Sequence, residues 1–296
     1  MNQKTNDRKS ILMIISSMLI FGTIGIFRKY IPVSSAFLAF SRGTLGGFCI
    51  LLFLRLKHRK AGGKLPFRTL LGLAVSGALM GINWILLFEA YNHTTVAVAT
   101  LCYYMQPTIV MLLSPLIFRE KLTVKKSACA AVAIAGMVLV SGVIGDGGTQ
   151  GGSFQGILLG LGAAVFYSAV VIMNNLIQGI DAYQKTTVQL FSAGLVMIPY
   201  LLLTGGFSGA GFTPAAVLLL LVVGIVHTGI AYVLYFGSMD GLHVQTVAIL
   251  SYIDPVSALL FSALLLKEQL SVLSMIGAAM IIGSAVISEV QTKDRL

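Results

Sequence analysis

The chain has 296 residues, of which 57% are hydrophobic and only 10% are charged, and its mean hydropathy is +0.92. A soluble domain carries roughly 25% charged residues, so this composition excludes a water-soluble protein and indicates a polytopic membrane protein. The formal net charge of +10 does not indicate nucleic-acid binding, because the basic residues stand between apolar segments, where they orient membrane helices.

Ten apolar segments follow one another along the chain, each close to the ~17–25 residues that a transmembrane helix needs. In the first half they span residues 11–27, 33–53, 70–90, 97–117 and 127–144. In the second half they span residues 155–177, 188–203, 215–236, 244–266 and 273–288. We therefore predict an all-α polytopic membrane protein with ten transmembrane helices.

The distribution of Lys and Arg predicts the orientation of these helices. If the N-terminus is cytoplasmic, most of the 20 basic residues fall on the cytoplasmic side, and Arg28, Lys29 and Lys267 fall outside. An excess of basic residues inside is the usual pattern in membrane proteins. We predict a multi-pass protein of the cytoplasmic membrane with both termini in the cytoplasm. The first segment lacks a clear small-residue cleavage site, so we expect it to be retained as a helix rather than removed as a signal peptide.

One stretch of sequence occurs twice, at residues 96–123 and 244–271. Its matched residues stand 148 positions apart, half the length of the chain: Tyr104 and Tyr252, Pro107 and Pro255, Glu120 and Glu268. Such self-similarity is typical of a repeated structural unit. Because five helices per half is an odd number, the second half must enter the membrane from the opposite side. The prediction is two inverted five-helix repeats, residues 1–147 and 148–296, joined by a flexible, outward-facing, glycine-rich linker at 145–152.

The matched prolines fall at the centres of their predicted segments. Proline lacks an N–H and crowds the carbonyl group four residues before it, so Pro107 and Pro255 are predicted to break or kink two helices within the membrane. Broken helices near the midplane form the binding and gating regions of secondary transporters with inverted repeats. A pair of purely structural kinks is the alternative, since proline is common in transmembrane helices.

Aromatic and amide residues near these breaks are candidates for the wall of a substrate cavity, because they supply stacking surfaces and a few hydrogen bonds. The candidate substrate-binding residues are Asn83, Trp84, Tyr104, Tyr167, Asn174, Tyr232, Tyr235 and Tyr252. The repeat pairs Trp84 with Tyr232, as it pairs Tyr104 with Tyr252. Ordinary helix packing is the alternative interpretation for each of them.

Four ionisable residues stand at or near membrane depth: Arg42, Glu89, His227 and Asp254. A charge within the membrane is costly and indicates a functional role by default. Asp254, which adjoins Pro255, is the main candidate for coupling transport to protons, followed by His227 and by Arg42. Each has an alternative interpretation. Arg42 can pair with an acid or donate hydrogen bonds to backbone carbonyl groups freed by the helix breaks. Glu89 can form an interfacial ion pair, and His227 can have a packing role.

The ten-segment pattern, the duplication and the P-x(12)-E-x-L-[ST] ending of each half resemble the EamA-domain transporters of the drug/metabolite transporter superfamily. The endings read R-E-K-L-T and K-E-Q-L-S here. The resemblance implies a bacterial carrier with a central cavity between helices one, three, four, six, eight and nine. It also implies export of amino acids or other small metabolites. The positions that match the family's cavity are Trp84, Tyr104, Tyr167, Tyr232 and Tyr252.

We therefore predict a secondary transporter that works by alternating access in the lipid bilayer on a small-molecule substrate, without enzymatic activity, nucleic acid, metal or cofactor. Cys49, Cys102 and Cys129 lie in apolar runs without a C-x-x-C motif, which favours packing roles. A membrane-embedded enzyme or lipid-handling protein is the alternative, although the H-E-x-x-H motif of zinc proteases is absent. The sequence leaves open the substrate, the direction of transport, the coupling ion and the oligomeric state, a homodimer included.

Overall fold

Helices account for the regular structure of the part of the chain that the structure describes. The computed structural model describes residues 2–57, 65–119, 123–140, 153–204, 206, 212–239, 242 and 244–289, with the backbone alone for 2–7, 244, 245, 248 and 289. Within these residues there are fourteen α-helices, one π-helical segment and no strands. The predicted linker at 145–152, and Glu120 and Leu122 of the first E-x-L-T turn, lie outside the described residues.

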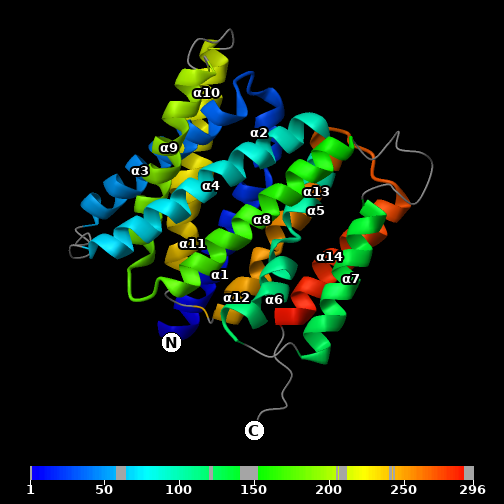
Figure 1. Ribbon diagram of the computed structural model, residues 1–296. Helices are drawn as coiled ribbons and strands as arrows, with labels where there is room; N and C mark the ends of the chain where they lie inside the picture. Colours follow the sequence, from blue (N-terminus) through cyan, green and yellow to red (C-terminus); the bar gives the residue numbers. More distant parts are fainter. Residues whose placement is uncertain are drawn as a thin grey trace.

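The helices follow the predicted segments in order (Figure 1). The first half contains α1 (Asn2–Gly22), α2 (Ile24–Tyr30), α3 (Ser35–Leu56), α4 (Phe67–His93), α5 (Val96–Tyr103), α6 (Gln106–Ile117) and α7 (Val124–Val140). The second half contains α8 (Phe154–Leu176), α9 (Ala182–Leu203), α10 (Pro214–Val222), η1 (Val223–Ile230), α11 (Ala231–Met239), α12 (Val244–Ser251), α13 (Ile253–Leu265) and α14 (Val272–Glu289).

Seven helical spans among the described residues are long and apolar enough to cross a membrane. They are Arg8–Tyr30, Ser35–Leu56, Phe67–His93, Val96–Ile117, Phe154–Leu176, Ala182–Leu203 and Pro214–Met239. The other three predicted segments correspond to shorter apolar helices, α7, α12 with α13, and α14. The chain is thus an all-helical, multi-pass membrane protein, whereas ten full spans remain a prediction.

Polar caps explain several helix boundaries. Thr123 and Ser271 cap the helices that follow them: their hydroxyl oxygens accept N–H bonds from Lys126 at 3.3 Å and Ser274 at 3.1 Å. The predicted start of α9 at residue 188 is wrong by six residues, because the helix begins at Ala182. The carboxylate of Asp181 caps this start, so the polar residues after it form the first turns of the helix.

Close packing at glycines holds the bundle together. Helix α4 packs against α8 and α9, and α3 packs against α9. A Cβ atom on Gly43 of α3 would lie 2.6 Å from the carbonyl oxygen of Leu190 and 2.7 Å from the amide nitrogen of Gly194 in α9. At the side of the bundle α7 packs along α14, where a Cβ on Gly136 would lie 2.7 Å from the carbonyl oxygen of Gly277 (Figure 1). These backbone approaches leave no room for a side chain.

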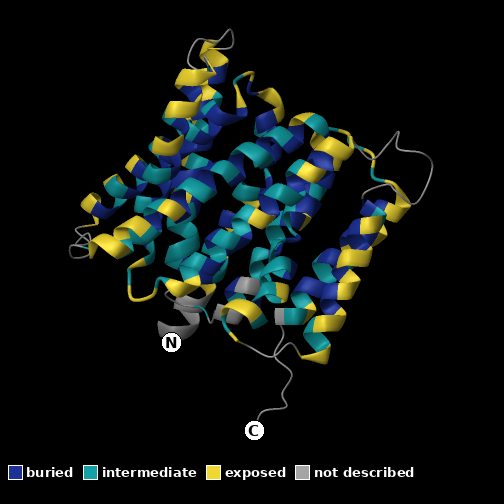
Figure 2. Cartoon of the chain, viewed as in Figure 1, coloured by how far each residue is buried: buried dark blue, intermediate teal, exposed yellow. Residues whose placement is uncertain are grey.

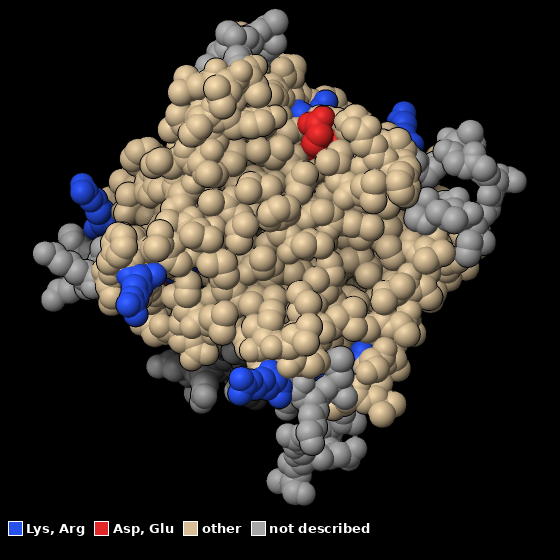
Figure 3. All heavy atoms as spheres, in the orientation of Figure 1, with Lys and Arg blue, Asp and Glu red and all other residues tan. Residues whose placement is uncertain are grey.

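The molecular surface suits a lipid environment. Buried residues line the inner sides of the helices, and exposed ones follow their outer sides (Figure 2). Many exposed side chains are large and apolar, such as Leu52, Leu116 and Leu218. On the face shown in Figure 3, Lys and Arg side chains lie towards the margins and the broad middle is uncharged. An apolar belt between charged ends is what a membrane-spanning protein presents to the bilayer.

Candidate functional site

Both segments that contain the matched prolines are broken in the structure. Helix α5 ends at Tyr103 and α6 begins at Gln106, while α12 ends at Ser251 and α13 begins at Ile253. Each proline lies in the first turn of its second half-helix, where a missing N–H removes no helical hydrogen bond. The prolines therefore start a new helix after a break, rather than kink a continuous one.

A cavity of about 1170 Å³ lies beside these breaks. Six of the predicted substrate-binding residues line it, namely Trp84, Tyr104, Tyr167, Tyr232, Tyr235 and Tyr252. Arg42, Pro107 and Asp254 line it as well. Their elements, α3, α4, α6, α8, α11 and α13 with the two break segments, come from both halves of the chain. The cavity is thus formed jointly by the two halves.

One hydrogen bond connects the two breaks. The hydroxyl group of Tyr104, in the first break, donates to the Oδ2 atom of Asp254, in the first turn of α13, at 2.5 Å. The matched Tyr104 and Tyr252 rings lie beside each other, with their centroids 6.5 Å apart. The repeat therefore brings its two equivalent tyrosines together at the site, and the acid is supplied by the second half alone.

Aromatic rings build much of the wall. Tyr103 and Tyr167 stack with centroids 5.1 Å apart and an interplanar angle of 13°, and Tyr232 stacks on Phe236 at 5.7 Å and 10°. Phe21 meets Tyr232 edge-on at 5.4 Å. Tyrosines have an apolar ring and a polar hydroxyl group, so this wall can stack a ligand and also hydrogen-bond it.

Among the described residues, Arg42 of α3 makes neither of the contacts expected from the sequence, an ion pair with an acid or a hydrogen bond to a freed carbonyl group. Its Cζ atom lies 4.2 Å from the ring centroid of Trp84, and its Nε donates to the Oγ1 of Thr228 at 3.0 Å. The Thr228 hydroxyl in turn donates to the carbonyl oxygen of Val223, five residues earlier in the π-helical segment η1. The described residues include no ion pair between Arg42 and Asp254. The cavity therefore contains a cation and an acid that do not neutralise each other directly.

The two predicted asparagines connect helices and do not line the cavity. Asn83 of α4 is fully buried and donates from Nδ2 to the carbonyl oxygen of Ala163 in α8 at 2.6 Å. Asn174 of α8 accepts a 2.7 Å bond from Gln189 of α9, whose amide also donates to Ser76 of α4. These bonds pair buried polar groups across helix interfaces, although the Oδ1 atom of Asn83 has no hydrogen-bond partner among the described residues.

His227 and Pro255 also lie outside the cavity lining. The Nε2 atom of His227, in η1, is 2.8 Å from the hydroxyl oxygen of Thr23, in the turn between α1 and α2. Its ring meets Phe27 edge-on, with centroids 4.5 Å apart. His227 therefore bridges the first two helices to η1, behind the wall of the cavity.

Several lining residues were not among the sequence-based candidates. They are Tyr91, Thr100, Tyr103, Gln106, Lys126 and Ser251. The repeat was a signal for three of these positions, because Tyr103 matches Ser251, and Gln106 matches the candidate Asp254, at the same 148-residue offset. Tyr91 and Thr100 have no such signal; their hydroxyl oxygens, 3.3 Å apart, meet only in the folded chain.

Comparisons with known proteins agree with this architecture. The sequence pattern of the EamA-like transporter family matches residues 8–142 and 154–289. An uncharacterized transporter of Bacillus subtilis, YxxF, is 27% identical over 290 residues, which cover 97% of this chain and 91% of that protein. An uncharacterized transporter of Archaeoglobus fulgidus is 27% identical over 278 residues, or 93% of this chain and 94% of that protein.

Two further similarities are more limited. The protein PecM of Dickeya dadantii is 27% identical over 230 residues, 75% of this chain and 74% of that protein. A solved crystal structure, described only as that of a protein, superposes with a TM-score of 0.67 at 21% identity. The superposition covers 94% of this chain and 96% of the other. At this identity the likeness establishes the fold alone.

Proposed function

The chain belongs to the EamA-like transporter family and is a membrane transporter, and from this premise we propose a more specific function. The protein is a secondary transporter that exports amino acids or similar small metabolites across the cytoplasmic membrane by alternating access. Two inverted five-helix repeats, residues 1–147 and 148–296, rock about the central cavity. Both termini are cytoplasmic in this proposal, and α1 begins and α14 ends at the same end of the bundle (Figure 1).

The observation that carries the proposal is the pair of opposite charges in one aromatic cavity. Arg42 and Asp254 both line the cavity without an ion pair between them. Buried charges are stabilised by partners of opposite sign. An amino acid supplies both partners, because its carboxylate suits Arg42 and its ammonium group suits Asp254. The surrounding rings then contact its side chain.

The remaining candidates have distinct roles in this proposal. Trp84, Tyr104, Tyr167, Tyr232, Tyr235 and Tyr252 contact the substrate. Asp254 exchanges a proton for substrate, because a single carboxyl group that faces each side in turn can carry one proton per cycle. The breaks at Pro107 and Pro255 act as hinges. His227, Asn83 and Asn174 support the helices behind the cavity.

Counterflow into liposomes tests the proposal across many candidate substrates at once. Vesicles that contain the purified protein are loaded with one unlabelled amino acid, and entry of the same radiolabelled compound is followed across a panel of amino acids. An accepted amino acid should be taken up, whereas its methyl ester, which lacks the carboxylate, and its N-acetyl derivative, which lacks the ammonium group, should not. Absence of counterflow for every compound, or chemical conversion of the loaded solutes detected by mass spectrometry, would refute the proposal.

A further inference from the structure

A carboxylate from the second half of the chain binds the first turn of α5 in the first half. Glu268 stands in the link between α13 and α14. Its Oε1 accepts the backbone N–H of Val96 at 3.0 Å, and its Oε2 accepts that of Ala97 at 3.3 Å. The hydroxyl group of Ser262 donates to the same Oε2 atom. The bonds to Val96 and Ala97 join residues that are more than 170 positions apart in the sequence.

The first N–H groups of a helix have no partner within the helix and carry a partial positive charge, so a carboxylate there is stabilising. Thr95 caps α5 from within the same half, but its hydroxyl oxygen reaches only the N–H of Val98, at 3.1 Å. Val96 and Ala97 are completely buried. Glu268 therefore supplies the hydrogen-bond acceptors for these two N–H groups. If Glu268 leaves, water must reach the start of α5 to replace it.

The backbone before Glu268 has an unusual conformation. Lys267 has φ 53°, in the left-handed region that residues other than glycine rarely adopt, at a cost of roughly 1–3 kcal/mol. Arg119, its counterpart 148 positions earlier, has φ 57°. The same bend thus follows α6 and α13, which indicates that it belongs to the repeated E-x-L-[ST] motif. In the second half this bend comes directly before Glu268, the residue that binds the start of α5.

The contact closes one end of the cavity, which we call the closed end and define by Val96, Ala97 and Val98, all at most 2% exposed. A Cβ on Gly25 of α2 would collide with the side chain of Val96. Lys29 of the same helix donates to the carbonyl oxygen of Thr94 at 3.3 Å. The closed end is therefore tightly packed around the start of α5.

The opposite end, which we call the open end, is less tightly packed. There the cavity lining reaches Phe118 after α6, Lys126 of α7, Gln178 after α8 and Ser288 near the end of α14, all partly or fully exposed. In Figure 1 the end of α6 and the end of α14 lie at the bottom of the bundle, away from the start of α5. Among the described residues, the exposed part of the cavity lining thus lies at this end, as one state of an alternating-access cycle requires.

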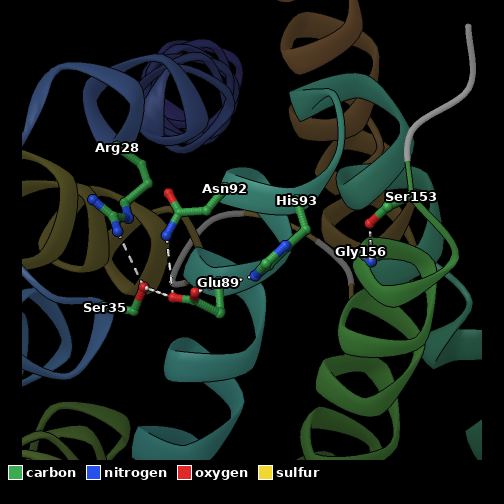
Figure 4. Close-up of polar contacts among 7 residues, drawn as sticks. All are labelled: Arg28, Ser35, Glu89, Asn92, His93, Ser153 and Gly156. Carbon is green, nitrogen blue, oxygen red and sulfur yellow. Dashed lines mark hydrogen bonds and ion pairs between the residues drawn. The ribbon is translucent and has the colours of Figure 1, made fainter.

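Another polar cluster near the closed end does not join the halves in this way. Glu89 of α4 accepts a bond from Ser35 at 2.7 Å and from Asn92 at 3.1 Å, and it pairs with His93 at 3.4 Å (Figure 4). Arg28 donates to Ser35 at 3.2 Å. All five side chains come from the first half, although the backbone carbonyl oxygen of His93 also accepts the N–H of Ser153, from the second half, at 3.2 Å. The side-chain bonds of the cluster can therefore persist while the halves move, whereas the bonds from Glu268 cannot.

From these contacts we infer that Glu268 is a positioning residue for transport, a latch that holds the start of α5 and keeps the closed end shut. The inference rests on the proposed alternating access and adds the contact that favours one of its two states. Helix α5 leads directly into Tyr103 and Tyr104, the latter bound to Asp254. Release of Glu268 therefore frees the closed end and also the residues of the site.

Site-directed cysteine labelling tests the latch. In a background without Cys49, Cys102 and Cys129, a single reporter cysteine replaces Thr100, which lines the cavity near the closed end, or Val171, which lines it elsewhere. In Glu268→Gln, a membrane-impermeant maleimide added on the closed-end side should label the Thr100→Cys reporter about tenfold faster, as expected for loss of a charged helix cap. Labelling of Val171→Cys from the other side should not increase, because only one end is released.

Thr95→Ala is the matched control, because it removes a cap from the same helix turn without touching a bond between the halves. Its labelling rate should change little. An equal increase in Thr95→Ala, an increase at both reporters, or an unchanged rate in Glu268→Gln would each overturn the latch. If Glu268→Gln does not fold, Ser262→Ala removes one bond to the carboxylate and should raise the rate by a smaller factor; no rise there would also overturn it.

The labelling assay needs no substrate, so it separates the latch from the proposed function. A side-specific increase in vesicles that show no counterflow would support the latch and refute amino acid transport. Counterflow with no labelling change in Glu268→Gln would support transport and refute the latch.

Discussion

Replacing Asp254 with asparagine tests how transport is driven. Asp254 is the only acidic residue among the described residues that line the cavity, so the structure predicts one proton exchanged per substrate. One proton crossing a gradient of one pH unit releases about 1.4 kcal/mol, which supports roughly tenfold accumulation of substrate. Asparagine cannot release a proton, so Asp254→Asn should accumulate no substrate in a pH gradient. It should still exchange substrate for substrate when the pH is equal on both sides, but only at higher substrate concentrations, because the ammonium group of the substrate loses its charged partner.

A loss of protein stability in Asp254→Asn should not account for this result. The side-chain oxygen of asparagine can still accept the hydrogen bond from Tyr104, and exchanging a charged acceptor for a neutral one costs on the order of 1 kcal/mol. The assay measures uptake of the amino acid that counterflow identifies, in proteoliposomes with and without an imposed pH gradient. Tyr104→Phe is the control, because it removes the hydrogen bond to Asp254 but retains the carboxyl group, so uptake should still depend on the gradient. Undiminished gradient-driven uptake in Asp254→Asn would refute the reasoning and make His227 the next candidate.

Three further predictions concern the wall, the packing and the topology. Tyr104→Ala and Tyr252→Ala should each lower the rate of counterflow at least several-fold with normal membrane levels by immunoblot, because each removes cavity wall; normal rates would reduce both residues to packing. Gly43→Ala should lower the melting temperature, since overpacking costs typically ~1–3 kcal/mol. Gly283 has open space around it, so Gly283→Ala should leave the melting temperature unchanged or raise it. Equal effects of the two substitutions would contradict the packing argument. A cysteine placed just before α8 should react with an impermeant reagent only from outside, and one placed just after α8 should react only from the cytoplasm. The reverse result would overturn the inverted topology.

The sequence by itself determined the class of protein and predicted its division into two halves. An apolar composition with few charges can be stable only in a membrane, because a water-facing surface would need more polar residues. The repeated stretch at residues 96–123 and 244–271 located both helix breaks, since proline restricts its own backbone and its neighbours whatever the tertiary contacts. It also indicated the positions at which Tyr104 and Tyr252 line one cavity.

Only the tertiary structure decided which polar residues face that cavity and which connect helices. Asn83 adjoins Trp84 in the sequence, yet one bonds to α8 and the other lines the cavity, because neighbours on a helix point about 100° apart and the bundle surrounds α4 on several sides. Arg42 binds Thr228 only because the π-helical segment presents that hydroxyl to α3. Glu268 meets the start of α5 only because the two halves pack together. Contacts between residues so distant in the chain depend on how the helices assemble, which no local pattern encodes.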